Sequence, residues 1–182
     1  MPLSPPAERV LRHERQVKIN GYERQDGLWD IEAHLQDTKT SILDTVDGRQ
    51  IPAGEPLHGM WLRLTIDTDL LIVAVDAAMD HTPYRHCSDI EPAFQKLVGE
   101  RIGGGWRRMI REKLGGVQGC THLVELLTPI ATTAYQTLYE ILHAKTGKVP
   151  LNGCHAWADD GEVVREYHPR FYRDPAQGPT TS

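Results

Sequence analysis

Three cysteines, each with a histidine within two positions, are the residues of this chain best suited to chemistry. They occur in the stretches RHC (Cys87), GCTH (Cys120, His122) and GCH (Cys154). Thiolate and imidazole are ligands that zinc and iron both accept. The spacing matches no zinc finger or ribbon, because the chain has no C-x-x-C pair. Two interpretations follow: a metal site built from Cys87, Cys120, His122 and Cys154, or three small apolar side chains within the fold.

Cys120 has the local sequence that most favours reactivity. The stretch LGGVQG precedes it and an apolar helical pattern follows, so it falls at a predicted helix N-terminus. Unpaired N–H groups and the positive end of the helix dipole stabilise a thiolate there. Such a thiolate could bind a metal, or attack an electrophile with His122 or His58 as its base. The alternative is that Cys120 only forms the edge of a core helix.

A second concentration of polar residues lies nearer the N-terminus. Asp30 and Glu32 are two positions apart in a strand pattern, so they share one face of the strand. With Arg15 or Arg24 to hold a substrate carboxylate, and His58 close by, they could form an acid–base site. The simpler interpretation is that Asp30 and Glu32 belong to the solvated face of a half-buried sheet.

The elements that must position these residues follow from a change in hydrophobic period. Strand-like alternation runs through VKINGYER, LWDIEAHLQD, MWLRLTID and LLIVAVDAAMD, with turns at QDG and DTDL. From residue 88 the period is helical, in DIEPAFQKLVGERI, GWRRMIREKL and CTHLVELLTPIATTAYQTLYEILHAKTG. Pro129, inside the last stretch, predicts a kink or a late helix start. The sequence DDG near the end of the chain predicts a short hairpin.

The predicted fold class is α+β. An N-terminal antiparallel β-meander over residues 15–80 is followed by three C-terminal helices, over residues 88–145, packed on one face. A single domain is expected over residues 9–172 of the 182, because no repeat or long linker divides them. The proline-rich residues 1–8 are expected to be disordered, and residues 173–182 to form a flexible tail.

Composition excludes several classes of function. The chain has 20 basic and 25 acidic residues and a net charge of −5, whereas nucleic-acid-binding domains are strongly basic. No run approaches the ~18 apolar residues of a membrane span, and no apolar signal segment opens the sequence. Three widely spaced cysteines favour a reducing compartment over a disulfide framework. We expect a cytoplasmic protein with a small-molecule substrate and no nucleic-acid or membrane partner, which could form a homo-oligomer.

Most of the chain, from about residue 9 to residue 172, resembles a bacterial family of uncharacterised proteins catalogued as a domain of unknown function. The stretches that carry this resemblance are HERQVKINGYERQDGLWDIEAHLQDTK, GEPLHGMWLRLTID, LVGERIGGGW, LGGVQGCTHLVELL and GCHAWADDGEVVREYHPR. Members of the family often accompany genes of acyl-CoA or aromatic-compound catabolism, which implies an enzyme of catabolism. A fainter similarity, in the order of elements, is to U-type iron–sulfur scaffold proteins. Cys87 and Cys120 match two of their cysteine positions, and the middle cysteine has no counterpart here.

These patterns favour a small cytoplasmic metal-binding protein that holds zinc or iron through cysteine and histidine. One alternative is a metal-free enzyme that acts on an aromatic or acyl-CoA substrate through a pocket of Asp30, Glu32, Arg15 and His58. Another is a non-catalytic interaction module, which would be marked by an exposed apolar patch.

Overall fold

The computed structural model describes residues 3–175, and the chain divides into two compact units, residues 1–139 and 140–182. The assignment of residues 9–172 to one domain stays a prediction, as does the disorder of residues 1–8. Most of the expected flexible tail, residues 176–182, lies outside the described residues.

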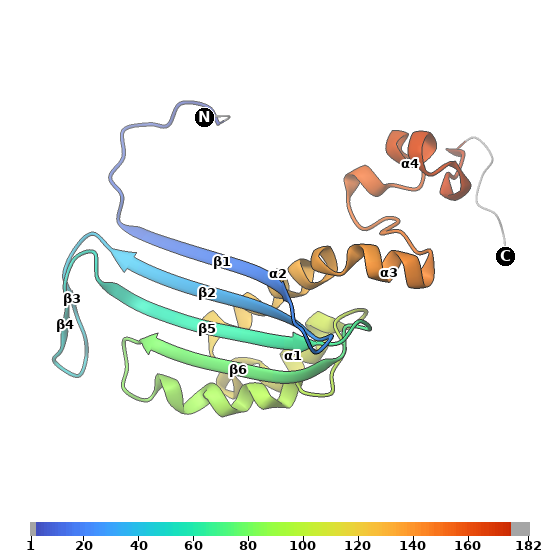
Figure 1. Cartoon of the computed structure of the whole chain (residues 1–182). Helices are drawn as coiled ribbons and strands as arrows, with labels where there is room; N and C mark the ends of the chain where they lie inside the picture. Colours follow the sequence, from blue (N-terminus) through green and yellow to red (C-terminus); the bar gives the residue numbers. More distant parts are fainter. Residues whose placement is uncertain (1–2, 176–182) are drawn as a thin grey trace. The chain divides into compact units, whose positions relative to one another are not determined.

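The first unit is built on a four-stranded antiparallel sheet, which confirms the predicted meander (Figure 1). Its strands are neighbours in chain order: β1 (His13–Glu23), β2 (Trp29–Lys39), β5 (Pro56–Ile66) and β6 (Ile72–His81). Gly27, at φ 82°, lies in the turn between β1 and β2, where the sequence QDG predicted a turn. The turn-rich segment between β2 and β5 also contains a separate small hairpin, formed by β3 (Leu43–Asp44) and β4 (Gln50–Ile51).

One face of the sheet is apolar because successive side chains of a strand point to opposite faces. Alternate residues of the two central strands are almost completely buried: Ile31, Ala33, Leu35, Met60, Leu62, Leu64 and Ile66. Burying a large aliphatic side chain of this kind contributes about 1.5–3 kcal/mol relative to leaving it exposed. The alternation therefore fixes which face of the sheet the helices must cover.

Helices follow the sheet in the chain and pack on this apolar face, as expected for the α+β class (Figure 1). In the first unit they are η1 (Cys87–Leu97), α1 (Trp106–Leu114), η2 (Gly116–Gln118) and α2 (Thr121–Thr137). α2 lies against β1, β2 and β5, and it buries Leu123, Leu126, Leu127, Ile130 and Ala134. No helix of residues 3–175 combines the length and the apolar content that crossing a membrane requires.

Two helical predictions need correction. The stretch around Phe94 is a 3-10 helix, with Pro92, which has no N–H to donate, inside it. The helix does not start late at Pro129, because α2 begins at Thr121 and contains Pro129, whereas the long helical pattern is divided at Leu138. The Leu138 backbone, at φ −99° and ψ 8°, leaves the helical region, and α3 (Tyr139–Thr146) begins at the next residue.

The second unit contains α3 from Glu140 onward, followed by short helices and loops: η3 (His155–Trp157), α4 (Glu162–Tyr167) and η4 (Pro169–Phe171). The hairpin predicted around DDG is wrong. Gly161 of that sequence is the N-terminal cap of α4, and its carbonyl accepts the N–H of Arg165 in the first helical turn. Asp159 accepts hydrogen bonds from Asn152 and Arg173 and so ties this loop together.

Candidate functional site

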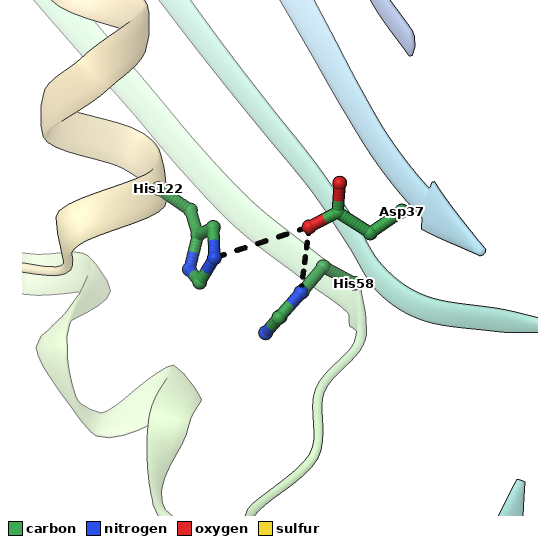
Figure 2. Close-up of side chains that lie close together, drawn as sticks. All are labelled: Asp37, His58 and His122. Atoms are coloured by element: carbon green, nitrogen blue, oxygen red, sulfur yellow. Dashed lines mark hydrogen bonds and ion pairs between the residues drawn. The ribbon is translucent and has the colours of Figure 1, made fainter. Parts of the chain in front are cut away.

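A row of polar residues crosses the helix-facing side of the sheet near the end of β2. Arg15 of β1 lies directly opposite Asp37 of β2, and Asp37 lies opposite His58 of β5. Residues that face each other in neighbouring strands point to the same side of a sheet. Their side chains therefore gather on the face that is otherwise apolar, and His122 reaches them from the first turn of α2 (Figure 2).

Asp37, His58 and His122 form the only group of three or more potential metal ligands found among residues 3–175, with one ligand atom from each within 4.8 Å of the others. His58 Nδ1 lies 2.9 Å from Asp37 Oδ2, and His122 Nε2 lies 3.9 Å from the same oxygen (Figure 2). The two imidazole rings lie against each other, with their centroids 3.9 Å apart. Two histidines and one carboxylate are a ligand set of mononuclear zinc and iron sites that keep positions open.

Arg15 allows the Asp37 carboxylate to be completely buried. Its Nε and Nη2 atoms donate to the two carboxylate oxygens at 2.7 and 2.8 Å. Its Nη1 donates to Glu125 Oε2 of α2 at 2.7 Å, so the same guanidinium also ties β1 to α2. His13 Nε2 lies 3.3 Å from Asp37 Oδ1. A buried carboxylate without partners would cost several kcal/mol, and this two-pronged, charge-assisted pair offsets the cost.

The protonation states of the three residues suit metal binding. Burial opposes ionisation of Asp37, but hydrogen bonds from Arg15 and His58 lower the pKa of its carboxyl to about 2. Burial lowers the pKa of His58. Burial likewise lowers the pKa of His122, and the neighbouring His58 acts in the same direction. At neutral pH the group is one carboxylate and two neutral imidazoles, the forms that coordinate a cation.

Cys120 lies beside this group without being one of its three members. It is the N-terminal cap residue of α2, which confirms the predicted helix start, and it is partly buried. Its Sγ atom lies 4.0 Å from Nδ1 of His122. Asp37 faces the other ring nitrogen of His122, Nε2. The thiol is therefore placed to orient the His122 ring, or to react with the ring as its base.

The other two cysteines occupy different places. Cys87 is the first residue of η1, and Cys154 is exposed in the second unit. All three cysteines are free thiols. The group of three includes the predicted ligand His122 and none of the cysteines, so the roles of Cys87, Cys120 and Cys154 as ligands stay predictions.

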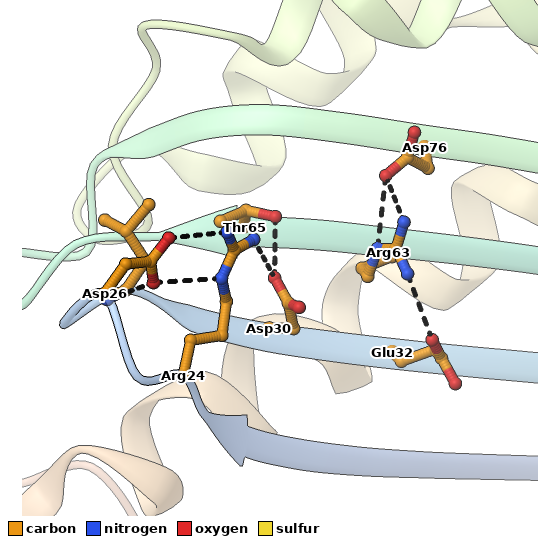
Figure 3. A network of polar contacts seen from close by, with 8 residues as sticks. Arg24, Asp26, Asp30, Glu32, Arg63, Thr65 and Asp76 are labelled. Carbon is orange, nitrogen blue, oxygen red and sulfur yellow. Dashed lines mark hydrogen bonds and ion pairs between the residues drawn. The ribbon is translucent and has the colours of Figure 1, made fainter.

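Asp30 and Glu32 lie on the opposite face of the sheet, where charged side chains bind one another (Figure 3). Thr65 Oγ1 donates to Asp30 Oδ1 at 2.7 Å, and Glu32 lies 3.7 Å from Arg63. Because Arg15 points to the helix-facing side, the structure does not bring it together with these two acids. It brings Arg15 and His58 together with Asp37 instead.

Sequence reasoning missed Asp37, although a signal for it was present. Asp37 continues the alternation of Ile31, Ala33 and Leu35, the buried residues of β2. A carboxylate at a position of the buried series must be paired in the folded protein. That pattern alone could have selected Asp37 over the neighbouring acids of the strand.

The fold and the site together define a small α+β protein with a histidine–aspartate cluster between its sheet and its longest helix. A family model described as "Protein of unknown function (DUF2889)" matches residues 13–136, and the chain belongs to that family. The matched range includes Arg15, Asp37, His58 and His122, and it ends before Cys154. Comparison with curated proteins and with solved structures found no match.

Proposed function

We propose that Asp37, His58 and His122 bind a single Zn²⁺ or Fe²⁺ ion, and that the protein is a cytoplasmic enzyme that uses this ion on a small-molecule substrate. The observation that carries the proposal is the convergence of three ligand atoms within 4.8 Å, all from residues in metal-binding protonation states. Three protein ligands leave at least one coordination position for water or substrate, the mark of catalytic rather than structural sites.

The charges around the group support a cation. Asp37 and Glu125 are both paired with Arg15, so these three side chains together keep one net negative charge. In the proposed site Arg15 is a positioning residue that fixes the Asp37 carboxylate, as hydrogen-bond partners of metal ligands commonly do. His58 would bind through Nδ1, the nitrogen that faces Asp37; its proton would then sit on Nε2, and the ion would replace the hydrogen bond to Asp37.

Metal titration of the full-length protein tests the proposal. After removal of metal with a chelator, calorimetry with Zn²⁺, and with Fe²⁺ without oxygen, should give one equivalent bound. His58→Gln and His122→Gln should abolish this binding. His86→Gln is the matched control, because the His86 side chain is 92% exposed and lies outside the group. Failure of the wild-type protein to bind either ion, or equal loss in the His86 variant, would contradict the proposal.

The contact between Cys120 and His122 favours a second candidate function, thiol catalysis without a metal. A thiol beside an imidazole, at the start of a helix, is the arrangement of an activated nucleophile. In metal-free protein this function requires Cys120 to be alkylated faster than Cys87 and Cys154, which mass spectrometry of the labelled peptides would show. Equal labelling of the three cysteines, with metal bound at one equivalent, would leave only the metal site.

A further inference from the structure

The two edge strands of the four-stranded sheet, β6 and β1, differ in whether other parts of the chain bond to their outer sides. At the β6 edge, other parts of the chain occupy the backbone groups. The N–H and carbonyl of Ile72 bond to Glu100 and Gly99, and the carbonyl of Val75 accepts the side chain of Gln95. This edge is therefore covered and cannot accept a further strand over that length.

The β1 edge is open by comparison. All eleven residues of β1 pair with β2, and no other strand in residues 3–175 pairs with β1 on its outer side. An open strand of this length is a template for a second strand. Large apolar side chains are also exposed along this edge and just before it: Val10, Leu11, Val17 and Tyr22.

We infer that β1 pairs with β1 of a second copy of the chain, antiparallel and about a twofold axis at Gln16, so that two four-stranded sheets become one. Charge favours this register among those that keep the same faces together. It places Glu14 opposite the partner's Lys18, and by symmetry this pair occurs twice. An axis at Lys18 would place two lysines face to face, and an axis at Val17 would place Lys18 opposite glutamine. An axis at Ile19 would bring Arg15 and Arg24 to the partner's Glu23 and Glu14, but both guanidinium groups already hold acids of their own chain.

The same register covers the exposed apolar side chains. When the pairing is extended beyond the strand, Val10 meets the partner's Tyr22, and both are exposed in the single chain. Leu11 then lies beside the partner's Gly21, the position that Thr137 of α2 packs against. The pairing therefore shields apolar surface that the single chain leaves in water.

This pairing also bears on the site, although it rests on the sheet edge and not on metal binding. Arg15 is placed opposite the partner's Val17, and His13 opposite the partner's Ile19, on the helix-facing side. The side chains of Arg15 and His13 are 34% and 40% exposed in the single chain. In the pair, apolar side chains of the second copy stand beside them and close that flank of the site.

Cysteine cross-linking tests the register. In Gln16→Cys the two introduced thiols face each other across the axis, with Cα atoms about 5 Å apart, a distance that a disulfide spans. Asn20→Cys is the matched control on the same face of the same strand, where the two copies of residue 20 lie roughly 26 Å apart. Mild oxidation should yield a disulfide-linked dimer of the first variant and none of the second. Both variants keep the same native cysteines, which controls for their reaction.

Analytical ultracentrifugation tests the association itself. The wild-type protein should be a dimer, Lys18→Glu should raise its dissociation constant about tenfold or more, and the double variant Glu14→Lys/Lys18→Glu should restore it. A monomeric wild-type protein, a double variant as weak as Lys18→Glu, or equal cross-linking at residues 16 and 20 would each overturn the inference. Circular dichroism of each variant separates lost pairing from lost folding.

Discussion

At the scale of single residues, Asp37 is the centre of the cluster, since Arg15, His13, His58 and His122 all lie close to its carboxylate. Asp37→Asn keeps its shape and removes its charge. We expect a loss of about 2–3 kcal/mol in the free energy of unfolding. This is less than the 3–5 kcal/mol typical of a fully buried pair, because Arg15 is one-third exposed. Urea unfolding of the metal-free protein measures this loss.

Asp26→Asn is the matched control for that change, because Asp26 pairs with Arg24 where both side chains are well exposed. It should unfold close to the wild-type midpoint. An Asp37 variant as stable as the Asp26 variant would show that the buried pair does not stabilise the fold.

The lowered pKa values of the two histidines predict acid sensitivity. In the unfolded chain both histidines protonate near pH 6.5, while in the folded protein they resist protonation. The unfolded state therefore binds more protons below about pH 6.5, and the free energy of unfolding falls as the pH falls through this range. The depressed pKa of Asp37 adds a further loss only at more acidic pH, from about 3.9 toward 2.

Chemical denaturation of metal-free protein between pH 7.5 and 5.5 measures this effect. His58→Gln should reduce the slope of stability against pH, because one of the two groups no longer titrates. If the slope is the same in that variant, His58 is not held neutral by the fold.

A third residue-scale prediction distinguishes the cysteines. Cys120→Ser should weaken Zn²⁺ binding about tenfold, because the Cys120 thiol contacts the ring of the proposed ligand His122. Cys154→Ser should leave the affinity unchanged, since Cys154 is exposed and lies outside the group of three. Calorimetric titration of both variants checks this ranking, and a larger loss in the Cys154 variant would reverse the roles.

At the scale of elements, the contact between β1 and α2 depends on Gly21. A Cβ atom at this position would lie 2.1 Å from Thr137 Oγ1. Gly21→Ala should therefore destabilise the protein by about 1–3 kcal/mol, as overpacking usually does. In Gly21→Ala/Thr137→Ala the obstructing side chain is shortened. The double variant should therefore lose less free energy of unfolding than the two single variants lose in sum. Thermal unfolding of the three variants gives this coupling. If the losses simply add, the contact between Gly21 of β1 and Thr137 of α2 does not limit the stability of the protein.

Much of the fold could be predicted from the sequence because its signals are local. The alternation of Ile31, Ala33 and Leu35 marked β2, and the change of period marked the start of the helices. Two of the errors concern local structure: the helix at Phe94 adopts the tighter 3-10 form around Pro92, and DDG caps a helix instead of turning a hairpin.

The site was only half predictable. His122 and His58 could be selected by residue type, but their convergence on Asp37 depends on strand register and on where α2 crosses the sheet. Those are long-range contacts, which no local pattern encodes. The strand pattern MWLRLTID left His58 outside the predicted strand, whereas β5 begins at Pro56 and includes it.

At the scale of the whole molecule, the family match and the first compact unit nearly coincide: residues 13–136 and 1–139. The three proposed ligands and the apolar face of the sheet all lie in this unit. A chain that ends after Thr146, which keeps α3 whole, should therefore unfold cooperatively and still bind one equivalent of Zn²⁺. Denaturation curves and calorimetry check both points. A truncated chain without a cooperative transition would show that the second unit is needed for folding.

The cluster takes Asp37 and His58 from the sheet and His122 from a helix that comes much later in the chain, which has a consequence for biosynthesis. A ribosome adds about 5–20 residues per second, so His122 is made roughly 3–13 s after His58. During that interval the nascent sheet can offer an incoming ion two ligands at most. Loading of the proposed site must therefore wait until α2 has been synthesised and has docked on the sheet.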